Sequence, residues 1–364
     1  MLRRRAASPA KSYVDVGTSP DSLDDSSFAL SRREPTVPEL DSHQLRHVRL
    51  LAAPSANYQV FLGCYYAANG ALDVAVKRLT PKRQADTDFV LLFVDHIHLL
   101  ARLRHVNVVA VVGVVWNNRS NAEVALEYMD QGSLRDLLTS TNPLTVAWAE
   151  HKHQLAADIA RALAYLHSQD VAHQQLSMDA VLLSTSVHRI VAKLSGIAFQ
   201  RDAFVMSRTS TTSSTMSRLS SLLRNSTSCF SYRSSLAPSM YLQKWMAPEV
   251  LRGERATAAS DMYSFGVFLS VLDTHEDPYK HHIDMDDELI LQRISYGVLR
   301  PTLSVLCPPG IAELALACLE PSPLDRPTAL TVQSYLETPR LCSVTSSFTS
   351  SRSMTQRRSL TVVL

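Results

Sequence analysis

The sequence predicts an α+β protein with two lobes, in which a β-rich N-terminal half precedes an α-rich C-terminal half. Two runs rich in β-branched and aromatic residues, 58–63 and 72–79, flank the turn-forming pair Asn69-Gly70, which predicts a β-hairpin. In the second half, apolar residues recur with helical spacing over 155–166. Strands followed by helices in this way are typical of an α+β domain.

The N-terminal half is predicted to contain one helix among its strands. An amphipathic helix follows the hairpin, because four apolar residues recur at helical spacing: Phe89, Phe93, Ile97 and Leu100. Two apolar runs, 108–116 and 122–128, then flank the polar turn 117–120 and predict a second pair of strands.

The C-terminal half is predicted to be mainly helical. One long helix is marked by the shared face of Leu155, Ile159, Leu163 and Leu166. A second apolar helix is expected over 261–272, and the last third continues as helices interrupted by Pro and Gly.

Both ends of the chain are polar and rich in Ser. This composition predicts a disordered arm over 1–44 and a flexible Ser/Thr-rich tail over 339–364, which leaves 45–338 as the folded domain. The chain of 364 residues is 46% hydrophobic, enough for a sizeable core, and its net charge is only +2. We therefore expect no nucleic-acid partner, and the charge balance does not call for a membrane partner.

The five cysteines are dispersed and form no CxxC pair. This pattern argues against a disulfide framework or a zinc site, and it predicts a reducing, cytoplasmic location. We expect no membrane-spanning helix, because the sequence has no run of about 18 apolar residues. The basic N-terminus is not followed by an apolar stretch, so we expect no secretory signal.

Seven short motifs stand in a fixed order along the predicted domain. They are Val-Ala-Val-Lys (74–77), Leu-Arg-His-Val-Asn-Val-Val (103–109), Glu-Tyr-Met-Asp-Gln-Gly-Ser-Leu (127–134), Ala-Tyr-Leu-His-Ser (164–168), Lys-Trp-Met-Ala-Pro-Glu-Val (244–250), Asp-Met-Tyr-Ser-Phe-Gly (261–266) and Asp-Arg-Pro-Thr (325–328). Their order and spacing resemble those of eukaryotic protein kinases, and specifically the tyrosine-kinase-like group of serine/threonine kinases.

The resemblance covers 45–338 and implies the bilobal protein-kinase fold. It divides the domain into an N-lobe (45–126), a hinge (127–132) and a C-lobe (133–338). Within the C-lobe it implies a long Ser/Thr-rich activation segment over 199–244. Phosphates added among the arginines of this segment would order it, and an unmodified insertion without a function is the alternative.

The resemblance also implies where a nucleotide would bind. Lys77 stands at the position that pairs with the α- and β-phosphates, while Val60, Ala75, Glu127 and Met129 stand at positions that surround the adenine. Strand alternation independently places Ala75 and Lys77 on one face of their strand.

The residues that carry phosphoryl transfer in this family are missing. The family's catalytic loop reads His-Arg-Asp, with Lys two residues and Asn five residues after the Asp; here the corresponding positions are Gln175, Ser177 and Ala180. Gly196 replaces the metal-binding aspartate that follows Lys-Leu-Ser. The site therefore lacks the general base and offers no side-chain oxygen at either metal-ligand position.

The N-lobe departs from the family in two further places. The three glycines of the phosphate-binding loop become Ala53, Ser55 and Tyr58, and the helix glutamate that pairs with the lysine becomes His96. Glycines let the backbone approach phosphates closely. Tyr58 has two open interpretations: an aromatic residue packed on its strand, or a ring that takes the place of a nucleotide.

The scaffold positions of the family are retained at Glu249, Asp261 and Arg326. We therefore predict a pseudokinase that acts as a scaffold or allosteric partner of an active kinase or a receptor complex. The sequence establishes no cofactor for it. The alternative is a weakly active serine/threonine kinase with Asp179 or Asp202 as unusual metal ligands. A third possibility is that ATP binds without Mg²⁺ and is not turned over.

Overall fold

The computed structural model describes residues 37–338, with gaps at 53–54, 56, 69, 119–120, 144–145, 187–188 and 199–238. Most of the predicted arm, all of the predicted tail and most of the predicted activation segment therefore lie outside the described residues, as does Asp202. None of the helices in the described part is long and apolar enough to cross a membrane.

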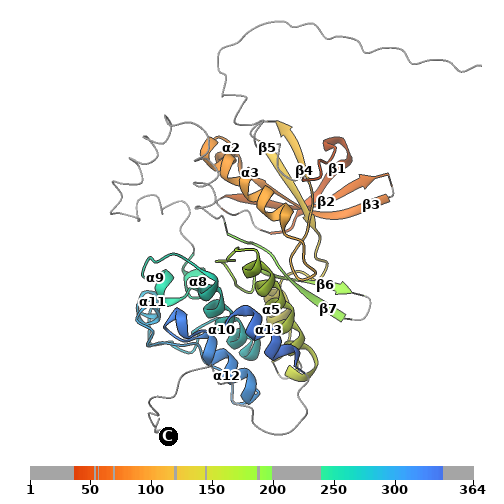
Figure 1. Ribbon diagram of the computed structural model, residues 1–364. Helices are drawn as coiled ribbons and strands as arrows, with labels where there is room; N and C mark the ends of the chain where they lie inside the picture. The colour runs from red at the N-terminus through yellow and green to blue at the C-terminus, as the bar shows by residue number, and fades with distance from the viewer. Residues whose placement is uncertain are drawn as a thin grey trace, which may run out of the picture. The chain divides into compact units, whose positions relative to one another are not determined.

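The N-terminal part is built on a five-stranded antiparallel sheet with the strand order β1-β2-β3-β5-β4 (Figure 1). The strands are β1 (Leu45–Leu50), β2 (Tyr58–Ala67), β3 (Gly70–Leu79), β4 (Val111–Asn118) and β5 (Asn121–Glu127). The predicted hairpin is confirmed, because β2 pairs with β3 in register from Tyr58↔Leu79 to Ala67↔Gly70.

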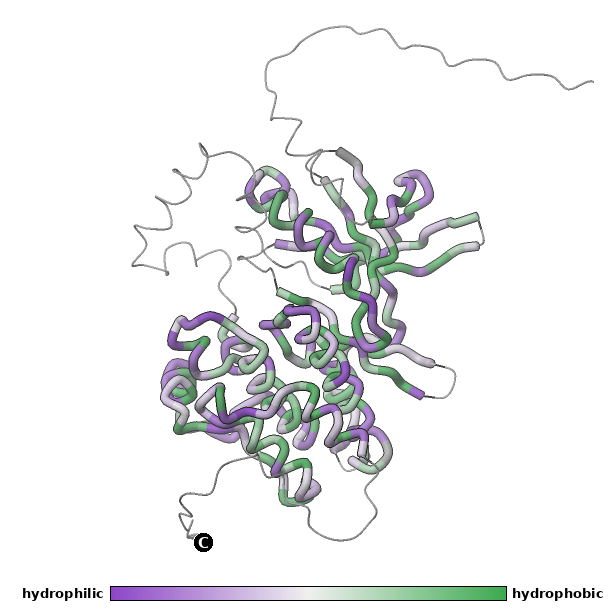
Figure 2. The backbone as a smooth tube through the Cα atoms, in the orientation of Figure 1, coloured by the Kyte–Doolittle hydropathy of each residue, from purple (hydrophilic) through white to green (hydrophobic). Residues whose placement is uncertain are grey.

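One face of this sheet packs against α3 (Thr87–Arg102), which follows the short α2 (Pro81–Gln84). The Asp86 side chain caps α3 by accepting a hydrogen bond from the backbone N–H of Phe89 at 3.2 Å. Hydrophobic and hydrophilic residues alternate along this helix (Figure 2). Its apolar face buries Phe89, Phe93 and Ile97 against Leu79 and Val124 of the sheet. The predicted amphipathic helix is therefore confirmed.

The C-terminal part is helical, as expected. Its α-helices are α4 (Leu134–Ser140), α5 (His153–Ser168), α8 (Met240–Gln243), α9 (Pro248–Leu251), α10 (Ala258–Thr274), α11 (Asp287–Ser295), α12 (Pro309–Cys318) and α13 (Ala329–Glu337). The short segments η2 (Trp148–Lys152) and η4 (Pro323–Asp325) complete it, whereas η1 (Ser42–Gln44) precedes β1 in the N-terminal part.

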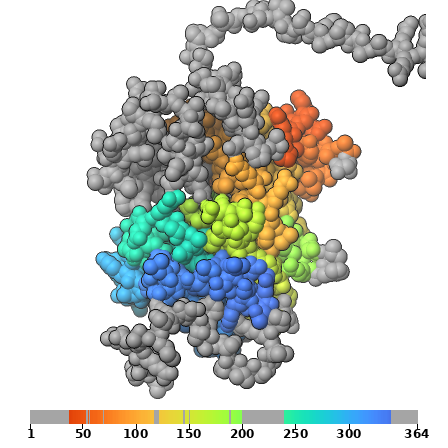
Figure 3. Space-filling model, in the orientation of Figure 1, coloured from red at the N-terminus to blue at the C-terminus, as the bar shows by residue number. Residues whose placement is uncertain are grey.

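Helix α10 forms the centre of the larger hydrophobic core. Fourteen consecutive residues of it, Ser260–Asp273, are buried, as expected for a helix surrounded by protein on all sides. Its closest helical neighbours are α12 and α5, and α13 packs against α5. In Figure 3 the blue segments that include α12 and α13 lie directly beneath the yellow-green segment that includes α5.

A second hairpin connects the core to the candidate site. Strands β6 (Val181–Ser186) and β7 (Arg189–Leu194) pair from Val181↔Leu194 to Ser186↔Arg189. The residues that precede β6 and those that follow β7 are therefore neighbours, and the Ser195 N–H donates to the Ala180 carbonyl at 2.8 Å. This register brings two segments with separate sequence motifs to one place.

Candidate functional site

The loop that precedes β6 is held by a buried carboxylate on α10. Asp261 accepts hydrogen bonds from the backbone N–H groups of His173 and Gln174, both at 2.7 Å, and lies 2.9 Å from His167 Nε2. Gln174 adopts a positive φ of 68°, a sparsely populated conformation for a residue other than Gly. Because charge-assisted bonds to two successive amides fix this conformation, Asp261 determines where the next residues of the loop lie.

Ala180 and Gly196 face each other across the base of the β6–β7 hairpin. A Cβ atom built on Gly196 would lie 3.9 Å from the Ala180 Cβ, and Gly196 itself has φ +75°. Side chains at these two positions would therefore meet, but neither residue has a side-chain oxygen. Mg²⁺ requires oxygen ligands at about 2.0–2.1 Å. These two positions do not fit a magnesium ion.

Elsewhere in the described residues, no group of three or more His, Cys, Asp or Glu side chains is arranged to hold a metal ion. Ser177, at the loop position where the resemblance predicts a lysine, is buried at 2% exposure. The described residues therefore provide no carboxylate cluster that would bind a metal ion.

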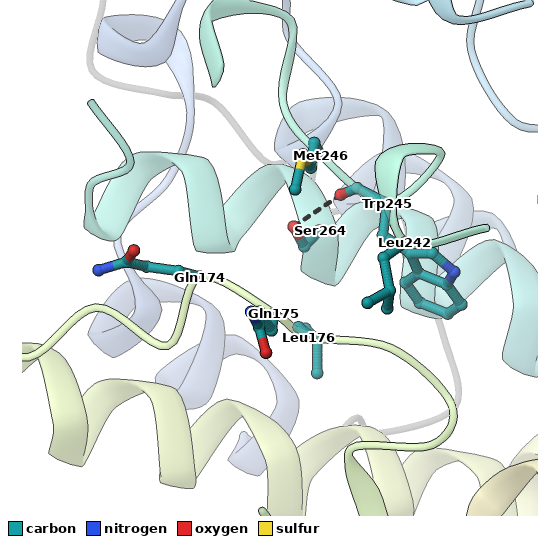
Figure 4. Close-up of a pocket in the computed structure, with 7 residues that line it drawn as sticks. All are labelled: Gln174, Gln175, Leu176, Leu242, Trp245, Met246 and Ser264. Carbon is teal, nitrogen blue, oxygen red and sulfur yellow. Dashed lines mark hydrogen bonds between the residues drawn. The ribbon is translucent and has the colours of Figure 1, made fainter. Parts of the chain in front are cut away.

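Gln175 stands at a small pocket between this loop and the segment that leads to α9 (Figure 4). The pocket is lined by Gln174, Gln175, Leu176, Leu242, Trp245, Met246 and Ser264. Ser264 on α10 closes one side by donating a hydrogen bond to the Trp245 carbonyl at 2.7 Å. In Figure 4 the side chains of Gln174 and Gln175 point in different directions. A carboxamide is neutral and is not a base at physiological pH, so the side chain beside this pocket cannot take up a proton.

Asp179, the nearest described carboxylate in this loop, is already paired. Arg135 at the start of α4 binds it through Nε at 2.7 Å and Nη2 at 2.9 Å, and Arg135 Nη1 reaches Asp277 at 3.2 Å. The hydrogen bond that Arg135 donates to Asp179, opposed by partial burial, raises the pKa of Arg135 above its usual range. A bidentate pair of this kind orients both Asp179 oxygens toward the guanidinium.

Lys77 lies on β3 and faces the same side of the sheet as its cross-strand partners Val60 and Val124, with Ala75 two residues away on that face. Its Nζ lies 4.1 Å from the centre of the Tyr58 ring. Burial lowers the pKa of Lys77 to about 8. Within the described ranges, no carboxylate forms an ion pair with this ammonium group.

His96 occupies the position on α3 that faces this lysine and is 5% exposed. Burial, and then the positive charge of Lys77, lowers the pKa of His96 to about 3. The imidazole is therefore neutral at physiological pH and cannot act as an anionic partner for the lysine.

The hinge-side residues take part in contacts of their own. The Glu127 carboxylate pairs with Lys193 at 2.6 Å, and the Glu127 N–H donates to the Ala110 carbonyl at 2.9 Å. Met129 is buried at 6% exposure. These contacts join β5 to β7 and set the spacing between the sheet and the helical part.

Glu249 and Arg326 form a buried bidentate ion pair with distances of 2.6 and 2.8 Å. The remaining donors of Arg326 reach backbone carbonyls of Glu320, Ala259 and Pro321 at 2.7–3.1 Å. All five N–H groups of the guanidinium thus have an acceptor, which is the condition under which a buried charge is tolerated.

Comparison with known proteins identifies the family. The family profile described as "Protein tyrosine and serine/threonine kinase" matches residues 55–336, which is most of the chain. The chain therefore belongs to the protein kinase family, and the two parts described above are the two lobes of its bilobal fold.

Several curated relatives share about a quarter of their aligned residues with this chain. It is 27% identical to the serine/threonine/tyrosine-protein kinase HT1 of Arabidopsis thaliana over 78% of this chain and 64% of that protein. It is 26% identical to the serine/threonine-protein kinase CTR1 of the same organism, over 72% of this chain and 28% of CTR1. The dual specificity protein kinase splA of Dictyostelium discoideum is 27% identical over 70% of this chain and 10% of splA. The chain thus spans less than two thirds of the length of each of these relatives.

Proposed function

We propose that this chain is a catalytically inactive member of the protein kinase family, a pseudokinase of the tyrosine-kinase-like group that acts as a scaffold or allosteric partner in phosphorylation signalling. The observation that carries the proposal is that Ala180 and Gly196, which the resemblance assigns to the metal-ligand positions, face each other without a side-chain oxygen. Gln175 at the position of the base adds to it, because its amide cannot accept the proton of a substrate hydroxyl.

The energetic argument is cumulative. Removing a general base costs roughly 10²–10⁴-fold in rate. A metal ion supplies several kcal/mol of charge stabilisation in the transition state. The two losses are not strictly additive, yet a site without the base and without both metal ligands retains only Lys77 of its charged groups. The retained scaffold contacts of Asp261, Glu249 and Arg326 support a role that depends on the folded surface.

A weakly active kinase is the alternative, with Asp179 or Asp202 as substitute ligands. Asp202 lies outside the described residues. Asp179 would have to leave its bidentate pair with Arg135 before it could bind a metal ion. We therefore favour binding over catalysis, with protein partners in the cytoplasm such as an active kinase or a receptor complex.

Phosphotransfer from labelled ATP tests the proposal. The full chain is assayed with Mg²⁺ and with Mn²⁺ beside the Lys77→Ala variant, both for autophosphorylation and with a general protein substrate. We expect no signal above the variant. Incorporation that the wild-type chain shows and Lys77→Ala loses would overturn the proposal and direct attention to the substitute ligands.

A further inference from the structure

We propose that the chain closes the phosphate end of its own nucleotide cleft: the Tyr58 ring covers Lys77, and the loop before β2 satisfies the backbone donors that a phosphate would otherwise take. This contact excludes nucleotide and holds α3 in place without one. The inference does not rest on the proposed lack of catalysis, because a kinase domain without metal ligands can still bind a nucleotide.

The first step of the argument is the environment of Lys77. Its ammonium lies 4.1 Å from the centre of the Tyr58 ring, well inside the range of a cation–π contact. Tyr58 stands opposite Leu79 on the strand pair, two residues from the Val60–Lys77 pair and on the same face. The ring therefore projects from the sheet onto the lysine, where the phosphates of a nucleotide would have to lie.

The second step concerns the backbone of the loop. Ser55 Oγ accepts hydrogen bonds from the N–H groups of Tyr58 at 2.9 Å and Asn57 at 3.3 Å, and the Ser55 N–H donates to the Tyr58 carbonyl at 3.0 Å. Phosphate-binding loops depend on successive backbone N–H groups that point at the anion. Three such groups here are directed into the loop itself, so they are not offered to a ligand.

The third step is the attachment of this loop to the helices. Arg83 of α2 donates to the Asn57 side chain at 2.8 Å, and the Thr80 N–H donates to the Asn57 carbonyl at 2.9 Å. Arg83 also pairs with Asp86, the capping residue of α3, at 3.3 Å, and lies 4.6 Å from the Phe89 ring centre. The loop is therefore held by contacts with α2 as well as by its own hydrogen bonds.

The fourth step is the contact with α3. The Tyr58 ring centre lies 5.8 Å from that of Phe93 and 6.2 Å from that of Phe89, distances at which aromatic side chains attract one another. His96 carries no negative charge in either protonation state, so it cannot form an ion pair with Lys77. Tyr58 replaces that link, since one ring touches both the lysine and the helix.

Nucleotide binding by the full chain tests the inference. Binding of ATP is measured by isothermal titration calorimetry in EDTA, so that metal ions play no part. The variants are Tyr58→Ala, Tyr58→Leu and Tyr58→Phe, and Tyr66→Ala on the same strand, whose side chain is 49% exposed, is the matched control. Thermal unfolding establishes that each variant is folded.

We expect no saturable binding by wild type, Tyr58→Phe or Tyr66→Ala. Tyr58→Ala is expected to bind ATP saturably, with an affinity at least roughly tenfold above the detection limit that wild type does not reach, and a further Lys77→Ala change should abolish the gain. Tyr58→Leu keeps an apolar side chain against Phe93 and removes the ring from Lys77, so it decides the outcome if Tyr58→Ala does not fold.

Two results would overturn the inference: saturable ATP binding by wild type that Lys77→Ala removes, or a folded Tyr58→Leu variant that binds no better than Tyr66→Ala. Binding by wild type without phosphotransfer would refute the closed cleft and leave the proposed function intact. Phosphotransfer by wild type would refute both.

Discussion

Replacing Arg326 with Ala is expected to be among the most destabilising single changes to the C-lobe. The substitution removes both charge-assisted bonds to Glu249, which remains only 3% exposed, and it frees three backbone carbonyls. A buried charge that loses its partner costs about 3–5 kcal/mol. With about 2–4 °C per kcal/mol for domains somewhat smaller than this one, the midpoint of thermal unfolding should fall by roughly 6–20 °C.

The matched control is Arg252→Ala. Arg252 also pairs with a glutamate, Glu254 at 3.0 Å, and bonds one carbonyl, but its side chain is 45% exposed. Exposed pairs contribute about 0–1 kcal/mol, so the control should lose no more than a few degrees. Both variants are compared by differential scanning calorimetry of the full chain. If Arg326→Ala melts within about 2 °C of Arg252→Ala, the assignment of this pair as the main buried clamp is refuted.

Three further predictions concern local features. Ser133→Ala removes the capping box of α4 and should cost about 1 kcal/mol in urea denaturation, whereas Ser140→Ala at the end of that helix should cost less than half as much. Gly266→Ala should cost about 1–3 kcal/mol, because its Cβ would lie 2.7 Å from Leu319 Cγ in the packed α10–α12 contact; no measurable loss would contradict that packing. The fold lowers the pKa of His96 to about 3. As the pH falls below about 6.5, the unfolded chain takes up a proton that the folded chain does not bind, so the free energy of unfolding decreases. By pH 5 the wild-type chain should have lost about 2 kcal/mol of its free energy of unfolding through this group. The His96→Gln variant should lose less over the same pH interval.

The strands and helices that sequence reasoning found share one property: each buries one face or all faces. The residues of α3 that were expected on one face include Phe89, Phe93 and Ile97, and these are the ones that the sheet covers. Strand β1 was missed because it lies at the sheet edge and most of its residues are exposed. Buried and exposed side chains therefore do not alternate along it. The β6–β7 hairpin was missed as well.

The candidate site shows the same limit at the level of single residues. Motif spacing predicted that Ala180 and Gly196 replace the metal ligands, but only the register of β6 with β7 brings the two positions face to face. The pairing of Arg135 with Asp179 joins residues 44 apart in sequence, and no local sequence pattern indicates a partner at that separation. Such pairs depend on how elements dock, which the periodicity of each element does not encode.

Tyr58 is compatible with both of its sequence interpretations, a packed aromatic residue and a ring that takes the place of a nucleotide. As an aromatic residue at the start of β2 it satisfies the packing requirement of α3, and in the same position it covers Lys77. The ring can serve both purposes because it has an apolar body and a face that attracts cations.

The predicted loss of the metal ligands also has a consequence for stability. A site that gathers several carboxylates for metal ions carries like charges that repel one another until the metal binds, and active sites of this kind commonly reduce stability for the sake of function. Here Gln175, Ala180 and Gly196 place no charge at those positions. The aromatic contact at Lys77 likewise needs no bound anion. The proposed function therefore predicts that the fold is equally stable with and without Mg²⁺ and ATP. A ligand-dependent rise in the unfolding midpoint would show that the cleft still recognises a nucleotide.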